Sequence, residues 1–171
     1  MMPTRNIFYV RLSSRDSIAM NNVNRTLDEG IPIEEISHLL SREQLNETRK
    51  YHPSKVFAWG SMPTEANHNI WSRMKNNDYF LVLIDRDIRY ISKIIMKLRS
   101  RELAKMFWGE TSSGKTWELI YLLTPPIKIY VPEEKIHEVT NKLTAFSPRG
   151  LNKFSDDRIE KIRNRYGTIH N

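Results

Sequence analysis

The run Tyr79–Ile84 (YFLVLI) constrains the fold most, because six consecutive apolar residues of high β propensity are typical of a strand buried on both faces. Similar β-prone runs occur elsewhere, and we expect further strands over 6–12, 55–59, 88–96, 117–123 and 127–131. These runs follow one another as in a meander, without the regular strand–helix alternation of a parallel sheet. The sequence therefore predicts a mixed α/β (α+β) fold, with a small, curved, mostly antiparallel sheet or barrel flanked by helices.

Helical patterns lie mainly between these runs. Ser13 and Ser14 can cap a helix that continues to about Gly30, and Pro32 suits the start of a second helix, which gives a helical insert over about 14–52. Residues 98–107 are ambiguous and could form a short helix. Other helices are expected over 63–74, after Pro132 and over 156–166, the last of them basic. No repeat or linker interrupts the chain, so we expect one domain over 1–171.

The charge distribution indicates a polyanionic partner. The net charge is +7, and residues 1–54 hold seven basic and seven acidic residues, so the whole excess falls on 55–171. Such an excess favours nucleic acid first and an anionic membrane second. No apolar run is long enough to span a membrane and the first ten residues lack the apolar core of a secretory signal, so we expect a cytoplasmic protein that binds no membrane.

Residue types that commonly hold metals or perform catalysis are sparse. The chain has no cysteine, and its five histidines are not at metal-ligand spacings. No nucleophile–histidine pair or carboxylate cluster stands out either. The sequence therefore predicts no metal, no cofactor and no catalytic residue, and it favours a binding domain over an enzyme.

Residues 109–116 (GETSSGKT) match the phosphate-binding-loop pattern at every fixed position. That loop joins a buried strand to a helix, whereas here the preceding residues are mixed and charged and the following residues 117–123 are β-prone. We therefore interpret the segment as a Gly/Ser hairpin loop in which Lys115 contacts a nucleic-acid phosphate. A nucleotide-binding enzyme that uses Gly109 to Thr116 stays open as an alternative.

Two of the four tryptophans occupy positions that suit a pocket. Trp59 and Trp108 each end an apolar stretch beside a glycine, a place where aromatic side chains often line a pocket mouth. Trp71 is expected in the core, and Trp117 in the core or at a rim. Pattern alone leaves a pocket and simple core packing equally open for Trp59 and Trp108.

The chain also resembles the YTH and EVE branch of the PUA-like superfamily over roughly residues 6–131. The resemblance rests on residues 56–63 (VFAWGSMP), Trp71, residues 78–84, residues 107–109 (FWG) and residues 117–123. It implies a small curved barrel flanked by helices. It also implies that Trp59 and Trp108 form a cage that stacks on a methylated base.

The resemblance extends to the polar contacts of that base. A backbone carbonyl falls on Gly60, with Ser61 beside it, and side chains after the first strand fall on Ser13 and Ser17, with Asp16 as a rival. The family often has asparagine at those side-chain positions. It also places a third aromatic residue before Thr116 in some members, where this chain has none; Trp117, Tyr9 or Phe57 could close the cage instead.

Within this superfamily the chain is most similar to the N-terminal DNA-binding domains of McrB-like restriction proteins. The helical insert, the basic charge and residues 146–154 (FSPRGLNKF) carry that similarity. It implies a reader of double-stranded DNA that flips out a methylated base, N6-methyladenine ahead of 5-methylcytosine. Cleavage would belong to motor and nuclease domains or subunits outside this chain. A reader of methylated RNA is the alternative.

Contacts to the nucleic-acid backbone are expected from basic residues along two stretches of the chain, from the end of the first strand and from the glycine-rich loop. They are Arg11, Arg86, Arg89, Lys93, Lys97, Lys115, Arg149, Lys153, Arg158, Lys161 and Arg165.

Overall fold

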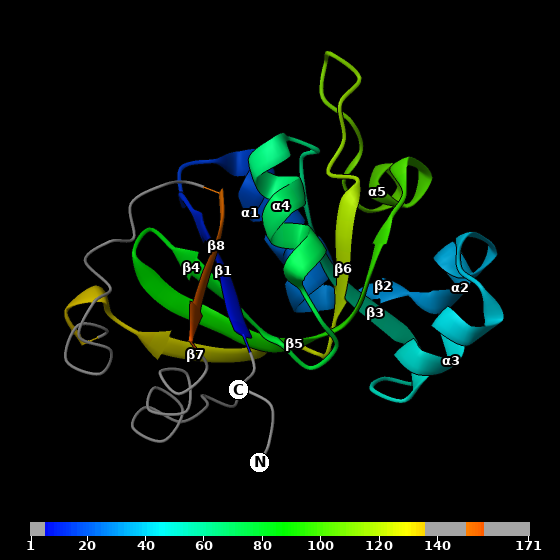
Figure 1. Cartoon of the computed structure of the whole chain (residues 1–171), viewed down its shortest axis with the longest axis horizontal. Coiled ribbons are helices and arrows are strands. Elements are labelled where there is room, and N and C mark those ends of the chain that lie inside the picture. The colour runs from blue at the N-terminus through cyan, green and yellow to red at the C-terminus, as the bar shows by residue number, and fades with distance from the viewer. Residues whose placement is uncertain (1–5, 136–149, 156–171) are drawn as a thin grey trace.

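The computed structural model describes residues 6–135 and the backbone of residues 150–155 (Figure 1). Its eight strands form one curved sheet in the order β2-β3-β6-β5-β4-β1-β8, with β7 paired to β5. The strands are β1 (Asn6–Leu12), β2 (Ile31–Pro32), β3 (Lys55–Ser61), β4 (Tyr79–Ile84), β5 (Asp87–Arg99), β6 (Leu119–Leu123), β7 (Ile127–Val131) and β8 (Gly150–Ser155). Among these strands β1 and β4 form the one parallel pair.

The mixed, mostly antiparallel architecture is therefore confirmed, but the barrel is not closed. The path of paired strands ends at β2 on one side and at β8 on the other, so the sheet is open. Both end strands were missed from the sequence. β2 has only two residues, and β8 is polar and pairs with β1 alone, so neither carries a strong apolar alternation.

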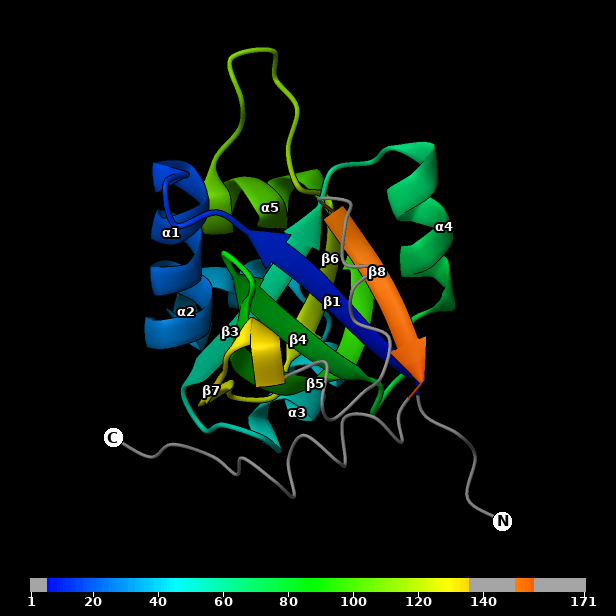
Figure 2. The ribbon, with the colours of Figure 1, turned by 90° about the vertical axis from the view of Figure 1, so that its left-hand side faces the viewer.

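Helices flank the sheet, and Figure 2 shows α1 and α4 on opposite sides of β1. The helices are α1 (Ser17–Val23), which continues as the π-helical turn η1 (Asn24–Glu29), α2 (Ile33–Ile36) with the 3₁₀ turn η2 (Ser37–Leu39), α3 (Arg42–Arg49), α4 (Glu65–Arg73) and α5 (Arg101–Trp108). The ambiguous segment 98–107 thus divides between β5 and α5. Ser100 marks the boundary, because its side chain accepts a hydrogen bond from the Leu103 amide.

The first helix begins later than expected. Asp16, rather than Ser13 or Ser14, is its N-cap, and the Asp16 carboxylate accepts a hydrogen bond from the Ala19 amide at 3.0 Å. Residues 13–16 are consequently a loop between β1 and α1. Beyond β7 a helical turn starts at Glu133, as Pro132 predicts. The rest of that helix and the predicted helix over 156–166 lie outside the described residues.

The two neighbouring strands β1 and β4 end at the same edge of the sheet. Every residue of β4 is buried, as its apolar run predicts, and β1 pairs beside it from Ile7 with Tyr79 to Leu12 with Ile84. Because the pair is parallel, both strands end at the same edge, where the Asp85 amide donates to the Leu12 carbonyl at 2.7 Å. The loops that follow β1 and β4 therefore meet.

Candidate nucleic-acid interface

A pocket of about 890 Å³ opens at the edge where β1, β3 and β4 end. Its wall comes from the end of β1 and the loop after it, one face of α1, the end of β3, the turn between β4 and β5, and Trp117. Five of the seven residues predicted to bind a base line it: Trp59, Gly60, Ser61, Ser13 and Asp16. The fold thus brings together segments that are far apart in the sequence.

Trp59 and Trp117 are the two tryptophans on the pocket wall. Trp59 is only 7% exposed and packs in the core with Phe8, Phe80 and Tyr121, so it forms a buried part of the wall. Trp117 is half-buried and immediately precedes β6. Trp117 is one of the three residues named from the sequence as a possible third aromatic side chain of the cage.

Trp108 occupies a different place from the one predicted. It ends α5 and does not line the pocket; its ring meets that of Trp59 edge to face, with centroids 6.2 Å apart and an angle of 63°. Its indole N–H donates to the hydroxyl of the fully buried Thr26 at 3.1 Å. Trp108 therefore packs against Trp59 and is anchored to η1 through Thr26, instead of lining the pocket.

Gly60 lies close to the backbone of Trp117 and to the ring of Trp108. A Cβ at this position would lie 2.6 Å from the Trp117 carbonyl oxygen and 2.7 Å from the Trp108 ring. No other residue fits between them, since real Cβ atoms do not approach so closely. Glycine at position 60 thus lets Trp108 and Trp117 close on the end of β3.

Two asparagine side chains on the pocket wall were not predicted. Asn22 on α1 and Asn67 on α4 both line it, whereas the predicted Ser17 is exposed and does not. The Asn67 amide nitrogen donates to the Met62 carbonyl at 3.0 Å, so this side chain is held on the pocket wall. A signal for Asn22 existed, because Asn22 lies four residues after Ile18 and so shares its face of α1.

The loop between β1 and α1 is fixed by Asp85. The Asp85 carboxylate accepts hydrogen bonds from the Ser14 amide at 2.9 Å and from the Ser14 hydroxyl at 2.7 Å. Asp85 has a φ of 62°, a left-handed conformation that aspartate tolerates better than most residues. Ser13 and Asp16 are consequently held at the pocket on both sides of this anchor.

This anchor should depend on pH. The hydrogen bonds from the Ser14 amide and hydroxyl lower the pKa of Asp85 from its ordinary value of 3.8. A lowered pKa in the folded state means that the stabilisation is complete above pH 3.8 and is lost as the pH falls through the lowered pKa. We expect the Ser14 amide resonance to titrate in NMR spectra with a midpoint below 3.8; a midpoint at or above that value would contradict the anchor.

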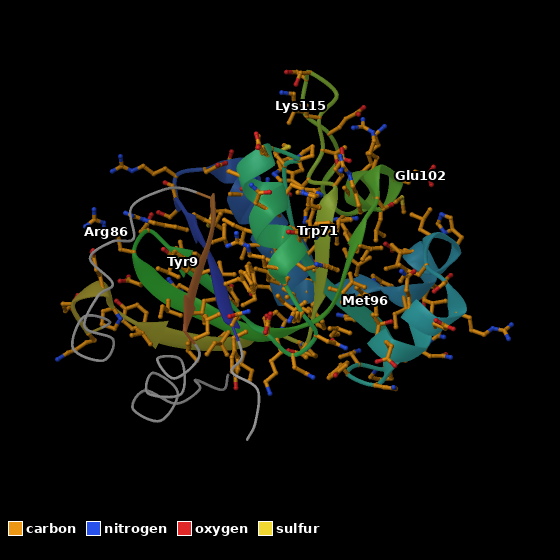
Figure 3. All side chains as sticks on the ribbon, viewed as in Figure 1. Tyr9, Trp71, Arg86, Met96, Glu102 and Lys115 are labelled. Atoms are coloured by element: carbon orange, nitrogen blue, oxygen red, sulfur yellow. The ribbon has the colours of Figure 1, made fainter. Side chains whose placement is uncertain are left out.

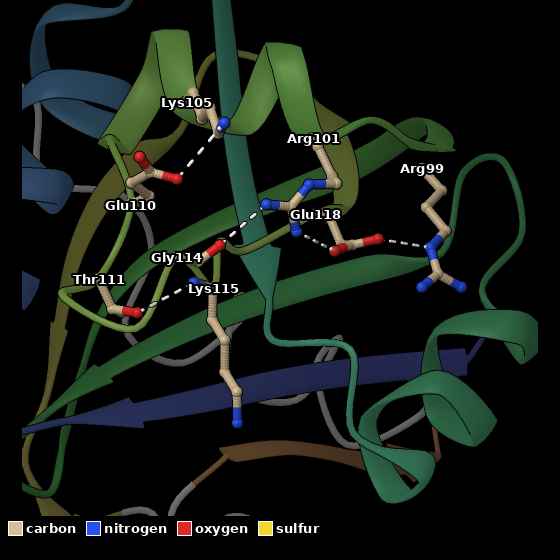
Figure 4. A network of polar contacts seen from close by, with 8 residues as sticks. All are labelled: Arg99, Arg101, Lys105, Glu110, Thr111, Gly114, Lys115 and Glu118. Carbon is tan, nitrogen blue, oxygen red and sulfur yellow. Dashed lines mark hydrogen bonds and ion pairs between the residues drawn. The ribbon is translucent and has the colours of Figure 1, made fainter.

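Residues 109–116 form a projecting finger between α5 and β6 (Figure 1). A turn closes it, since the Gly114 amide donates to the Thr111 carbonyl and the Thr111 amide to that of Lys115, both at 2.8 Å. Figure 4 shows how α5 braces it: Lys105 pairs with Glu110 at 3.4 Å, and Arg101 donates to the Gly114 carbonyl at 2.8 Å. Side chains of α5 thus contact the predicted hairpin loop at both of its ends.

The finger also lacks the architecture of a phosphate-binding loop. A helix precedes it and a strand follows it, which reverses the order that a nucleotide site needs. Thr116, whose hydroxyl would have to reach a magnesium ion, is fully buried. The nucleotide-binding alternative is therefore not supported by the geometry.

The comparisons with known proteins identify a solved structure with a similar fold. No protein-family model and no curated protein sequence matches the chain. A solved structure does: the N-terminal domain of Thermococcus gammatolerans McrB bound to m5C DNA, with 14% sequence identity and a TM-score of 0.66. The similarity covers 94% of this chain and 96% of that one. The chain has the fold of an McrB N-terminal domain.

In this McrB-like fold two of the predicted backbone-contacting residues reach the pocket. Arg11 and Arg86 both line it; Arg11 donates to the Asp85 carbonyl at 3.1 Å, and Arg86 pairs with Glu133 at 3.0 Å. Figure 3 shows Arg86 on the turn after β4 and Lys115 on the projecting finger. Arg15, which was not predicted, adds a third guanidinium to the wall.

Other predicted basic residues lie away from the pocket. Arg89 lies over the Tyr130 ring at 5.8 Å and Lys93 over the Tyr79 ring at 5.3 Å. Lys97 donates to the carbonyl of Trp71 at 3.2 Å and to that of Ser72, so it caps the end of α4, and burial lowers its pKa. Lys97 is thus tied to the end of α4, and its phosphate contact stays a prediction.

Part of the predicted interface lies beyond what the structure describes. Arg149, Arg158, Lys161 and Arg165 lie outside the described residues, and for Lys153 only the backbone, in β8, is described. Within residues 6–135 no group of three or more histidine, aspartate or glutamate side chains could hold a metal ion. None of the helices in the described part of the chain is long and apolar enough to cross a membrane.

Proposed function

We propose that this chain reads a methylated base in double-stranded DNA by taking the flipped base into the pocket lined by Trp59 and Trp117. The observation that carries the proposal is the pocket itself, which combines two tryptophans, polar side chains and three arginines at one edge of an McrB-like fold. In a modification-dependent restriction system, such a domain would select the DNA that separate motor and nuclease subunits cleave. The chain itself would act as a binding domain.

The energetics of a flipped base require such a pocket. Extruding a base costs a few kcal/mol, which stacking on aromatic side chains offsets at roughly 1–3 kcal/mol per contact. A buried methyl group adds only about 1 kcal/mol, so discrimination needs a wall that fits it closely. Trp117 suits this role because it is half-buried, whereas Trp59 is buried and presents little surface to the pocket.

The polar side of the pocket suits a base that carries an exocyclic amine. One Asp16 carboxylate oxygen caps α1, and the carboxylate can also accept from an amino group on the base edge. N6-methyladenine and 5-methylcytosine both have such a group. The YTH-like resemblance favours N6-methyladenine, while the similar McrB structure, which is bound to m5C DNA, favours 5-methylcytosine. Both bases are therefore candidates.

A single titration series tests the function. Matched duplex DNA and RNA probes of one sequence would each carry N6-methyladenine, 5-methylcytosine or no methyl group. We expect one methylated DNA duplex to bind at least about tenfold more tightly than its unmethylated counterpart. Tightest binding to methylated RNA would favour the RNA reader, and equal binding of all probes would refute the proposed function.

Lys115 would supply a phosphate contact beside the pocket. Its side chain points away from α5, and it lies two residues before Trp117 (Figure 4). We expect Lys115→Ala to lower the affinity for methylated and unmethylated duplexes equally. It should also reduce the slope of log K against log salt by about one. Lys50→Ala is the control, because Lys50 is exposed on the insert and pairs with Glu47. An unchanged salt slope in Lys115→Ala would argue against the contact.

A further inference from the structure

Ile18 is an exposed apolar side chain at the mouth of the pocket. It is 61% exposed, more than Tyr51, Met106 or Tyr130, the other large apolar residues that the described part of the chain exposes. Of these four, Ile18 alone lines the pocket. Single exposed apolar residues are common on proteins, so the informative observation is that this one lies on the wall of the pocket proposed to take the base.

The backbone around Ile18 is held in place. Ile18 lies in the first turn of α1, whose N-cap is Asp16, and the loop before that cap is tied to Asp85 through Ser14. Isoleucine is also stiff at χ1 because it is β-branched. The structure therefore presents a rigid apolar side chain from a fixed helix end.

Cationic residues line the same pocket. Arg15, Arg11 and Arg86 line it together with Ile18, so its wall combines an exposed apolar side chain with three basic ones. This arrangement matches a duplex lying over the pocket, with its phosphates near the arginines and its bases near the apolar side chain.

We propose that Ile18 is a wedge that enters the base stack where the flipped base has left it. The inference rests on the proposed function. A flipped base leaves its neighbours unstacked, and apolar side chains inserted between base steps are a general means by which proteins hold a distorted duplex. Ile18 fills the gap, while Trp59 and Trp117 hold the extruded base.

Comparing duplex with single-stranded DNA tests this role, because a single strand has no gap to fill. We expect Ile18→Ala to bind the methylated duplex about tenfold more weakly than the wild type, with unchanged binding of a methylated single strand of the same sequence. Ile18→Met should keep most of the duplex affinity, since an apolar side chain is retained. Met106→Ala is the matched control, as Met106 is 41% exposed and lies outside the pocket.

The outcomes separate the wedge from the function on which it rests. If the wild type prefers methylated DNA and Ile18→Ala binds the duplex as the wild type does, the wedge is refuted and the pocket stands. An equal loss on duplex and single strand would also refute it, because Ile18 would then touch the base itself. If the wild type shows no methyl preference, the proposed function fails first. Unchanged thermal unfolding of Ile18→Ala confirms that folding is intact.

Discussion

Replacing Trp117 with alanine is expected to remove most of the preference for methylated over unmethylated DNA. Trp117 is the pocket tryptophan with free surface, so its ring would contact the extruded base. The loss of one stacking contact of roughly 1–3 kcal/mol corresponds to about 5- to 150-fold in affinity for the methylated probe. Unmethylated DNA, which is held mainly through its phosphates, should lose much less.

Competition binding with matched duplexes measures this difference. Tyr130→Ala serves as the control, because Tyr130 is also an exposed aromatic residue but lies on β7, outside the pocket. Trp59→Ala is a poorer test, since Trp59 is buried and a large-to-small change in a core costs about 3–5 kcal/mol of stability. An equal loss on both duplexes in Trp117→Ala would show that no base contacts this ring.

Gly60→Ala is expected to disrupt both the fold around the pocket and the binding of methylated DNA. The added Cβ would lie 2.6 Å from the Trp117 carbonyl oxygen, a backbone atom that cannot turn aside, and 2.7 Å from the Trp108 ring. Overpacking of this kind lowers the free energy of unfolding by about 1–3 kcal/mol. In a chain of this length each kcal/mol lowers the Tm by about 2–4 °C.

Thermal unfolding and binding measured on the same preparation test this prediction. Gly114→Ala is a useful contrast, because Gly114 has a φ of +78° but its Cβ would meet open space, so it tests backbone strain without crowding. We expect Gly114→Ala to keep the preference for methylated DNA. A Gly60→Ala variant with wild-type Tm and binding would contradict the tight packing of Trp108 and Trp117 on β3.

Much of the sheet could be predicted because apolar runs mark buried strands. The bounds of β1, β4 and β7 coincide with the runs 6–12, 79–84 and 127–131. The pairing of β1 with β4 could not be read from the pattern. It joins segments about 70 residues apart, and its parallel direction is decided by the helices and strands between them.

The sequence predicted several of the residues that line the pocket, but not how all of them are arranged. Trp59, Gly60 and Ser61 follow from one contiguous segment that the family resemblance identifies. The resemblance placed Trp108 on the wall, but Trp108 ends the helix over Arg101–Trp108 and its indole N–H donates to Thr26. Asn22 was missed because it lies outside the segments that carry the family resemblance.

Fluorine NMR of protein labelled with 5-fluorotryptophan tests the central claim most directly, since the chain has only four tryptophans. Single Trp→Phe variants assign the four resonances. On adding a methylated duplex we predict large changes at Trp117 and Trp59, which line the pocket, and none at Trp71, whose indole N–H donates to the Ile120 carbonyl. Tight binding of methylated DNA that leaves the Trp117 resonance unmoved would contradict the account.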